Sequence, residues 1–530
     1  MGASQPSADT AYQIEKSLRF DDGDTPYLLR QVSSNGNTRT WTWSGWIKRG
    51  NIVAGGIFSS ATGGHPSVFL KIDNVAGQFE FANYNGSYLC QLKTTQVLRD
   101  PSAWFHIVVA VDTTHATAAS RNRIYVNGKE ITAWATQTNF SQYVETQMSK
   151  SDDPFRIGDH DGSYFDGYLS DVQFIDGLQL SPASFGEFDS ARNWNPAEFK
   201  LLGRNNGSTW SGMVTGTEDP GWEKTQVFNG NSANSGRAET GNTLTFTPTT
   251  KMERVASLRV FADHRYGSQS ASTLLVNGTN YSHLVPKTSG AWVDIPETTL
   301  ETIAWNSVLA ASGSSGDAID IGAIEVDGEI LVDGEVGYPN GTTRNNPNNG
   351  TTWSDHVSGS AYSGSYPASL AFNGTIGGDP AIAASTQTFS PPGGITVNDS
   401  LRIYQIKNGS GNTFTVNGTD YSGSTTEPGS WLTIPNVTTL TSVVWGTSGY
   451  NMERVSAIEV DGHILIDSSV DNSYHLKFND TSSNAAIGYD SLKTFSDSSF
   501  KAINGAPILK TNHDGSAVTS GYRTDDNATN

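Results

Sequence analysis

Two segments of this chain carry almost the same pattern of apolar and polar residues. Residues 323–333 read AIEVDGEILVD, and residues 457–467 read AIEVDGHILID. In each segment apolar and polar residues alternate, stop at Asp-Gly and then alternate again. Such alternation indicates a strand with one buried face, and Asp-Gly tolerates the positive φ angles of a type I′ turn. Each segment therefore predicts a β-hairpin, and its recurrence predicts a duplicated domain.

Other landmarks occur in the same order in both copies. The copies begin at NNGSTWS (205–211) and NNGTTWS (348–354), so the offset is 348 minus 205, or 143 residues. A period this long is a whole domain, because solenoid repeats are only ~20–50 residues long. We predict all-β domains at 201–336 and 337–470, with the Gly/Pro/Asn-rich segment 337–350 as the linker.

The first 200 residues predict another all-β domain. Segments such as TWTWSGWIKRG, GQFEFANYNGSYLCQL and WFHIVVAVDTT alternate or run apolar between Gly, Asn and Asp turns. This pattern is typical of a two-sheet antiparallel sandwich. The one helix candidate is residues 181–191, where Ser181 could cap a short turn that has Pro182 at its first position.

Residues 471–530 lack the pattern of an independent domain. Tyr474, Leu476 and Phe478 alternate as one strand, and the remainder is polar with scattered apolar residues. Such a segment cannot offset a backbone-ordering cost of ~1–2 kcal/mol per residue. We predict an extended arm that is ordered only against a neighbour, either the preceding domain or another protein. A chain ending at Asp471 is then expected to keep three folded domains.

Composition and charge narrow the function classes. The 55 Gly and 13 Trp, with only 16% charged residues, favour short strands and tight turns. A net charge of −20 without a basic block argues against nucleic acid as a partner. No stretch approaches the ~20 apolar residues of a membrane span, and the start MGASQPSADT lacks a secretory signal pattern. Cys90 is the only cysteine, so no intrachain disulfide forms.

The hairpin of the first copy superficially resembles a catalytic motif. Glu325, Asp327 and Glu329 form E-x-D-x-E, like the carboxylate strand of some glycoside hydrolases, which need two carboxyls about 5–5.5 Å apart when they retain configuration. Asp327, however, belongs to the turn, and the second copy has His463 in place of Glu329. We therefore interpret the motif as a structural hairpin and predict that the protein is not an enzyme.

Several aromatic and acidic residues are binding candidates. On Gly/Asn-rich loops, the candidates for stacking on sugars are Tyr84, Tyr88 and Tyr164. Tryptophans of the first domain could also stack on sugars, but sandwich core is the favoured interpretation for Trp41, Trp43 and Trp46. His106 lies in a predicted strand and is interpreted as structural.

Acidic Gly-rich loops offer oxygen ligands of the kind that calcium takes. The calcium candidates are Asp22, Asp24, Asp159 and Asp161, with Asp21 and Asp166 nearby in sequence. Solvated turn carboxylates are the commoner interpretation of such loops. We therefore predict no obligatory cofactor and keep calcium as the alternative.

The order of four segments resembles the laminin-G, or concanavalin A-like, lectin fold: SGWIKR, WFHIVVAVD, IYVNGKEI and FDGYLSDVQFIDG. More narrowly, IEKSLRF, TWTWSGWIKRG and YLSDVQFIDG resemble the N-terminal module of virion proteins from tailed marine phages, especially those of cyanobacteria. The duplicated units are similar to modules that follow this one, which extends the resemblance to about residue 470.

The segments VFNG and AFNG resemble the A-F-D-G stretch of discoidin-type jelly rolls, where the Asp helps to hold calcium. Here Asn229 and Asn373 replace that Asp. A neutral amide is a weaker ligand than a carboxylate for a hard cation. The resemblance therefore implies a jelly-roll-like fold without calcium at this position.

Together these observations predict an all-β protein. A concanavalin A-like two-sheet sandwich (1–200) precedes two duplicated jelly-roll-like β domains (201–336 and 337–470) and a C-terminal arm (471–530) that could anchor the protein to a particle. The resemblance implies a phage virion protein that decorates capsid or tail, contacts other virion proteins and host-surface glycans, and is present in several copies. The alternative is a cellular carbohydrate-binding protein or a fragment of a glycan-degrading enzyme.

Overall fold

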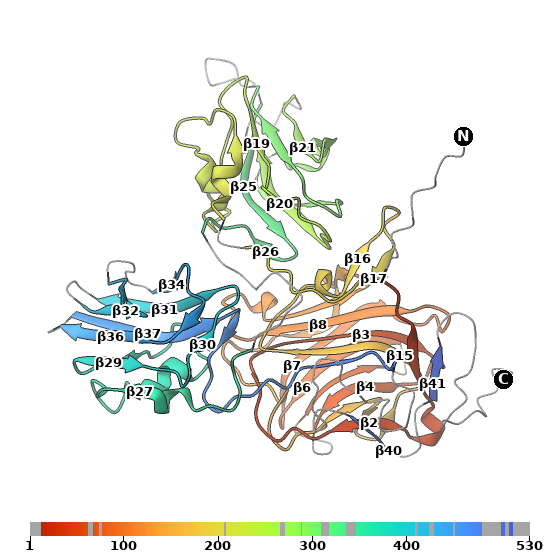
Figure 1. Cartoon of the computed structure of the whole chain (residues 1–530). Coiled ribbons are helices and arrows are strands. Elements are labelled where there is room, and N and C mark those ends of the chain that lie inside the picture. Colours follow the sequence, from red (N-terminus) through yellow and green to blue (C-terminus); the bar gives the residue numbers. More distant parts are fainter. Residues whose placement is uncertain are drawn as a thin grey trace, which may run out of the picture. The chain divides into compact units, whose positions relative to one another are not determined.

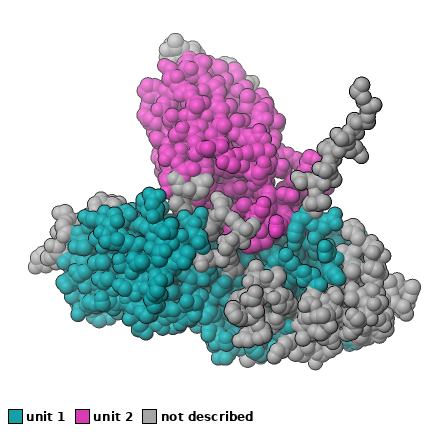
Figure 2. All heavy atoms as spheres, viewed as in Figure 1, with its two compact units in different colours: residues 1–180, 344–530 teal, residues 181–343 magenta. Residues whose placement is uncertain are grey.

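The computed structural model describes residues 12–61, 67–73, 77–205, 208–265, 271–287, 289–308, 317–334, 346–408, 412–422, 429–448, 451–479, 500–503 and 508–511. Within these ranges the regular elements are β-strands and short 3-10 helices (Figure 1). No helix in the described part of the chain is long and apolar enough to cross a membrane. The chain forms two compact units, Met1–Leu180 with Arg344–Asn530, and Ser181–Thr343 (Figure 2).

The first unit contains a sandwich of two antiparallel sheets, as predicted. The first sheet has the order β10-β9-β8-β3-β15-β1-β41, with β39 also paired to β15. Its strands are β1 (Lys16–Phe20), β3 (Thr40–Arg49), β8 (Phe105–Asp112), β9 (Asn122–Val126), β10 (Lys129–Glu130), β15 (Gly167–Asp176), β39 (Tyr474–Leu476) and β41 (Ile508–Thr511).

The second sheet has the order β11-β7-β6-β5-β4-β12-β2-β40, with β13 and β14 attached. Its strands are β2 (Tyr27–Arg30), β4 (Gly55–Ser60), β5 (Ser67–Ile72), β6 (Gln78–Tyr84), β7 (Tyr88–Val97), β11 (Trp134–Thr138), β12 (Phe155–Ile157), β13 (Asp159–His160), β14 (Ser163–Tyr164) and β40 (Lys501–Ile503).

Alternating residues of both sheets meet in one aromatic core. Trp41 and Trp43, on the same face of β3, are fully buried in this core. Trp41 meets Phe81 of the other sheet edge to face, with 5.7 Å between ring centroids. Trp46 points to the opposite face of β3 and stacks on His106 at 4.9 Å. The interpretation of these tryptophans as structural therefore agrees with their positions.

The last strands of the chain complete this N-terminal sandwich. β39 pairs with β15, β40 with β2 and β41 with β1, all antiparallel. In Figure 1 the blue strands β40 and β41 lie against the red and orange strands of the sandwich. The sandwich core includes four residues from this end of the chain: Tyr474, Leu476, Phe478 and Phe500.

A polar cluster fastens the segment before β39. The Asp176 carboxylate accepts hydrogen bonds from the backbone N–H of Asn37 (2.8 Å) and of Asn472 (2.9 Å). The Asn472 amide donates to Ser149 Oγ at 2.9 Å, and the Arg30 guanidinium donates to the carbonyl of Asn472 at 3.0 Å. Buried polar groups need such partners, so the sandwich and the C-terminal segment satisfy each other.

The sequence pattern predicts that 471–530 is an arm outside three domains. In the structure, the described part of this segment belongs to the N-terminal sandwich, and Asp471 is no domain boundary. The first unit also groups the second duplicated domain with the sandwich, whereas residues 181–200 group with the first duplicated domain. Phe495, one of the scattered apolar residues of this segment, lies outside the described residues.

The first duplicated domain has two sheets, β18-β19-β24-β21-β22 and β23-β20-β25-β26. Its strands are β18 (Val214–Thr215), β19 (Thr243–Phe246), β20 (Leu258–His264), β21 (Leu274–Val276), β22 (Thr279–Asn280), β23 (Ala291–Ile295), β24 (Ile303–Asn306), β25 (Ile319–Val326) and β26 (Glu329–Ile330). A separate hairpin of β16 (Gly186–Phe188) and β17 (Trp194–Pro196) precedes them.

The second copy has the strand path β27-β29-β36-β37-β31-β34, with β28, β32, β33 and β38 attached, and the pair β30-β35. Its strands are β27 (Val357–Ser358), β28 (Ala381–Ile382), β29 (Thr386–Phe389), β30 (Ile395–Thr396), β31 (Leu401–Asn408), β32 (Phe414–Val416), β33 (Thr419–Asp420), β34 (Ser430–Thr433), β35 (Thr439–Leu440), β36 (Val443–Ser448), β37 (Asn451–Val460) and β38 (His463–Ile464).

The repeated landmarks occupy equivalent elements in the two copies. The Asp-Gly turns join β25 to β26 and β37 to β38, and both residues of each turn have positive φ. Trp210 donates its indole N–H to Asn205 at 3.2 Å, and Trp353 donates likewise to Asn348 at 3.1 Å. The two copies are thus alike in side-chain contacts as well as in strand order.

Short 3-10 helices connect the strands. They are η1 (Asp22–Asp24), η2 (Ala118–Ser120), η3 (Pro182–Ser184), η4 (Trp210–Met213), η5 (Lys224–Phe228), η6 (Ser282–Leu284), η7 (Trp353–His356) and η8 (Ala368–Phe372). The helix candidate at 181–191 is therefore one 3-10 turn, which starts at Pro182 but receives no side-chain cap from Ser181. Most of the linker 337–350 lies outside the described residues, but Asn348 within it is buried.

The pairing of β39, β40 and β41 with the N-terminal sandwich, which we call the closure of the sandwich, predicts that residues near the C-terminus stabilise it. Leu476→Ala should lower the free energy of unfolding of the sandwich by ~2–5 kcal/mol, because it leaves a cavity in the aromatic core. Lys477→Ala, which removes the adjacent half-buried side chain, is the matched control. Urea unfolding of the full chain measures both.

A chain ending at Val470 should lose the sandwich altogether, whereas a chain ending at Thr511 should keep it. Equal unfolding midpoints for the Leu476→Ala and Lys477→Ala proteins would contradict the closure.

Candidate functional site

The outer face of the second sheet, which points away from the aromatic core, carries a row of five side chains, three of which are themselves buried: Ala82, Phe69 and Ser59. Strand register places Gln91, Ala82, Phe69, Ser59 and Arg156 opposite one another, from β7 through β6, β5 and β4 to β12. Directly paired residues point to the same face of a sheet. Their neighbours along the strands face the aromatic core, so this row points away from it.

A carboxylate lies in the middle of this face. Glu80, only 3% exposed, accepts a hydrogen bond from the Gln91 amide at 2.8 Å. Lys71 lies 3.5 Å from the Glu80 carboxylate and Lys93 lies 4.0 Å from it. Lys93 also pairs with Asp73, and this hydrogen bond raises the pKa of Lys93. The charged side chains in the middle of this face are therefore paired with one another.

Two predicted tyrosines meet at one end of the face. Tyr84 on β6 and Tyr88 on β7 lie 5.1 Å apart edge to face, and Tyr88 is 44% exposed. Partial burial raises the pKa of Tyr88, and the Glu80 carboxylate raises it further. The effect of the Glu80 charge on Tyr88 shows that the tyrosine pair lies beside the Glu80 carboxylate.

Aromatic rings continue across the sheet. His160 stacks on Phe69, with 4.0 Å between ring centroids and 27° between their planes. The third predicted tyrosine, Tyr164, lies at the opposite end of the sheet, 6.4 Å from Tyr27. The structure thus brings Tyr84 and Tyr88 together but places Tyr164 apart from them.

The four predicted calcium ligands are not gathered into one group. Asp159 is buried and paired with Arg156 at 2.9 Å, and Asp161 is an exposed turn residue with φ 53°. Asp24 lies in η1. Within the described ranges, the single group of three or more carboxylates whose oxygens lie within 4.8 Å of one another is Asp21, Asp22 and Asp166.

That group already contains a cation from the protein. Arg19 lies 3.0 Å from Asp166. Burial raises the pKa of the Asp166 carboxyl, whereas the hydrogen bond to Arg19 lowers it. The pairing of Asp159 with Arg156 and of Asp166 with Arg19 agrees with structural carboxylates, and calcium at these loops stays a prediction.

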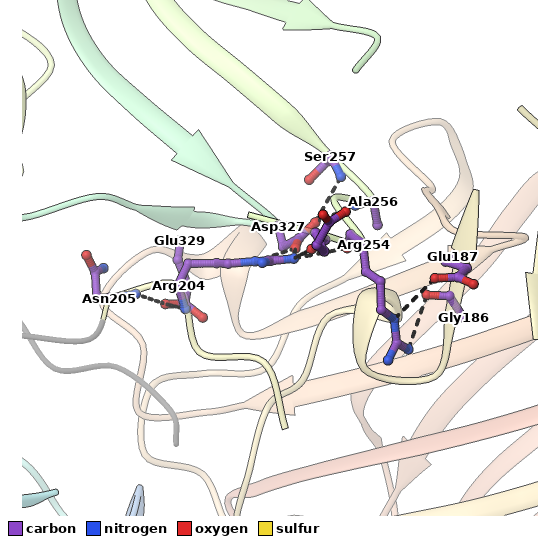
Figure 3. Close-up of polar contacts among 10 residues, drawn as sticks. Gly186, Glu187, Arg204, Asn205, Arg254, Ala256, Ser257, Asp327 and Glu329 are labelled. Atoms are coloured by element: carbon purple, nitrogen blue, oxygen red, sulfur yellow. Dashed lines mark hydrogen bonds and ion pairs between the residues drawn. The ribbon is translucent and has the colours of Figure 1, made fainter. Parts of the chain in front are cut away.

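The carboxylates of E-x-D-x-E in the first duplicated domain each have a structural partner. Glu325 forms two hydrogen bonds with Arg259, at 2.8 and 2.6 Å. Asp327 accepts hydrogen bonds from the Arg204 guanidinium and from the backbone N–H groups of Ala256 (2.8 Å) and Ser257 (2.9 Å) (Figure 3).

Glu329, at the end of the motif, accepts from the backbone N–H groups of Arg204 (3.1 Å) and Asn205 (3.2 Å) (Figure 3). Burial outweighs these bonds and raises the pKa of Glu329 to about 7. Arg254, nearby in Figure 3, instead donates to the carbonyl of Gly186 at 3.5 Å. The motif therefore forms the Asp-Gly hairpin that the sequence predicted, and its three carboxylates accept hydrogen bonds from residues of the same domain.

The histidine of the WFHIVVAVD segment is also structural. His106 is 1% exposed, and its Nε2 lies 2.9 Å from Ser44 Oγ. Burial lowers the pKa of His106 to about 3. The ring therefore stays neutral in neutral solution.

Comparison with known proteins supports the fold of the N-terminal sandwich. Residues 21–184 match a family described as Concanavalin A-like lectin/glucanases superfamily. This segment has a concanavalin A-like fold, and the term lectin domain refers to that fold alone. The two sheets of the lectin domain carry the faces described above. No curated protein sequence matches the chain.

Solved structures similar to the chain include a heptameric SAP-like pentraxin from Limulus polyphemus, at 15% identity and a TM-score of 0.25, covering 32% of this chain and 78% of the pentraxin. A putative carbohydrate binding protein from Bacteroides ovatus matches at 16% identity and a TM-score of 0.23, over 32% of this chain and 45% of that one. Domains LG4-5 of the mouse laminin alpha1 chain match at 9% identity and a TM-score of 0.23, over 62% of this chain and 93% of that one.

The sequence does not predict the cluster of charged side chains on the outer face, or the Phe69–His160 stack. Lys71, Glu80 and Lys93 lie on three different strands, so only the pairing register shows that they meet. The available signal was the alternation in GQFEFANY, which places Glu80 on the same face of its strand as Tyr84.

The raised pKa of Glu329 predicts a pH-dependent stability of the first duplicated domain. The folded domain holds a proton that an unperturbed Glu releases near its ordinary pKa of 4.5. Stability is then fully present below about pH 4.5 and declines as the pH rises toward 7. A half-buried group keeps only part of the 1.36 kcal/mol per pKa unit, so we expect a loss on the order of 1–2 kcal/mol.

Glu329→Gln should abolish this decline, whereas Glu239→Gln, at an exposed carboxylate of the same domain, should preserve it. Hydrogen exchange of peptides covering 319–333 between pH 5 and 8, corrected for intrinsic rates, measures the effect. A slope that survives in Glu329→Gln would contradict the assignment.

Proposed function

We propose that the protein binds glycans through the outer face of the second sheet of its lectin domain. The observation that carries this proposal is the pair of the half-buried Tyr84 and the exposed Tyr88 beside the Glu80, Gln91 and Lys93 side chains. Membership of residues 21–184 in a lectin and glucanase superfamily supports it.

The chemistry of sugars explains why this arrangement suits them. A pyranose ring has an apolar face of C–H groups and a rim of hydroxyls. Aromatic side chains offer a large rigid contact area with an apolar body and, in tyrosine, a polar tip. Carboxylate, amide and ammonium groups beside the rings give acceptors and donors for the hydroxyls. Because these charges are already paired with one another, the face suits uncharged glycans.

We further propose that binding is not followed by cleavage. The motif that resembles a hydrolase strand has its carboxylates engaged by Arg259, by Arg204 and by backbone N–H groups. In the second copy, Glu459 accepts hydrogen bonds from Arg402, and Asp461 accepts from backbone N–H groups. Because these carboxylates stabilise the fold in both copies, a structural role accounts for the motif and no catalytic role is needed.

The biological setting that we propose is the surface of a tailed phage particle. Support comes from the ordered motifs IEKSLRF, TWTWSGWIKRG and YLSDVQFIDG, which resemble the N-terminal module of phage virion proteins. In this setting the protein decorates capsid or tail in several copies, contacts other virion proteins and binds host-surface glycans. The alternative is a cellular carbohydrate-binding protein or part of a glycan-degrading enzyme.

Removing the exposed ring should weaken glycan binding. Tyr88→Ala should reduce the affinity for glycans found on an array by at least about tenfold, which corresponds to ~1.4 kcal/mol. Tyr362→Ala is the matched control, because Tyr362 is 53% exposed in the second duplicated domain. Titration calorimetry with the glycans selected on the array measures both variants.

The same glycans should be recovered intact after incubation. Equal affinities of the Tyr88→Ala and Tyr362→Ala proteins would contradict the proposed face. New reducing ends that disappear in Glu325→Gln or Glu329→Gln would contradict the absence of catalysis.

The virion setting predicts that the protein is a stable component of purified particles. Mass spectrometry of density-gradient-purified phage should find its peptides in constant ratio to the major capsid protein. Recovery of the peptides only from host-cell fractions would favour the cellular alternative.

A further inference from the structure

The outer face of the first sheet, on the other side of the lectin domain, carries a second row of aromatic and charged residues. Arg19 on β1 is paired with Tyr168 on β15, and Tyr168 is paired with Lys48 on β3. Trp104 immediately precedes β8, whose Phe105 pairs with Ile47. Leu18, Ile47 and Leu169 face the core, so these four neighbouring side chains point outward.

The four side chains form one ladder. The Arg19 guanidinium lies 5.4 Å from the centroid of the Tyr168 ring, and the Lys48 ammonium lies 5.9 Å from it. Trp104 completes the row, with 6.4 Å between its ring centroid and that of Tyr168. All four side chains are half-buried. They are therefore held in place while part of each stays accessible.

The charges of the two cations are balanced differently. Arg19 forms an ion pair with Asp166 at 3.0 Å. For Lys48, no carboxylate oxygen of the residues that the structure describes lies within 4.0 Å of Nζ. Asp100, on the loop before Trp104, accepts a hydrogen bond from the Ser102 backbone N–H at 2.8 Å. The pKa of Asp100 is lowered chiefly by its hydrogen bonds to Ser102 and only weakly by the charge of Lys48. In a chain of net charge −20, Lys48 is thus a cation beside the Tyr168 ring that has no ion pair within 4.0 Å among the described residues.

We propose that this row binds an anionic sugar residue, of the uronic acid or sulfated class. The carboxylate or sulfate pairs with the Lys48 ammonium, and the apolar face of the sugar lies on the Tyr168 or Trp104 ring. An ammonium group is a strong donor to such oxyanions. A single cation suits a single anionic group, whereas an extended polyanion such as nucleic acid is repelled by the net charge.

This site is distinct from the face proposed above. It lies on the other sheet, has a cation where the first face has neutralised charges, and selects a different class of sugar. A lectin domain with both faces could hold two residues of one mixed glycan, or two chains. Two weak sites that engage together raise the overall affinity well above that of either one.

The test uses the full chain and two probes, a galacturonic acid tetramer and the matched neutral galactose tetramer. Titration calorimetry should detect binding of the acidic tetramer, and Lys48→Gln should weaken it at least tenfold. Lys48→Arg should retain most of the affinity, since it keeps the charge. Lys129→Gln, at an exposed lysine of strand β10 in the same domain, should leave the affinity unchanged.

Three further measurements decide the matter. Tyr88→Ala should leave binding of the acidic tetramer unchanged, which separates this site from the face of the second sheet. Raising NaCl from 50 to 500 mM should weaken the binding, as expected for an ion pair. Equal thermal midpoints of the Lys48 variants and the unaltered protein exclude misfolding.

Two results would overturn the proposal: absence of acidic-tetramer binding by the unaltered chain, or equal affinities of the Lys48→Gln and Lys129→Gln proteins. A sulfated galactose tetramer, used in the same series, shows which anionic class the site prefers.

Discussion

The pairing of the last strands of the chain with the first ones is the contact on which the lectin domain depends. Asp176 is the last residue of β15. Its carboxylate accepts a hydrogen bond from the backbone N–H of Asn472, which lies 296 positions later in the chain. The entropy of closing a loop grows only with the logarithm of its length. Two whole domains between β15 and β39 therefore add little cost, provided that Tyr474 and Leu476 still fill the core.

This closure explains why the two outer faces of the lectin domain can differ in chemistry. β41 extends the first sheet beside β1, which carries Arg19, and β40 extends the second sheet beside β2. Each sheet is thereby held by both ends of the chain against one core. On one face the charges are paired around Glu80, while the other face carries the half-buried Lys48, which has no ion pair within 4.0 Å among the described residues.

Period-two alternation and turn chemistry were sufficient to predict the sandwich, the duplicated domains and the buried Trp41 and Trp43. They could not predict the closure, because β39 and β40 have only three residues each and their partners lie at the other end of the chain. The same limit applied to the sites. Tyr84 and Tyr88 lie on either side of one turn, so the sequence alone places them close together. The contact among Lys71, Glu80 and Lys93 depends instead on the register between three strands.

The E-x-D-x-E motif shows how a duplicated domain separates structural from catalytic carboxylates. Glu325 and its counterpart Glu459 each form two hydrogen bonds with an arginine on the neighbouring strand, Arg259 or Arg402. Asp327 and Asp461 each accept backbone N–H groups beside the turn. The third position differs, with Glu329 in one copy and His463 in the other. The two positions that keep a carboxylate in both copies are the two whose carboxylates have the same structural partners in both, which favours folding as the reason for the motif.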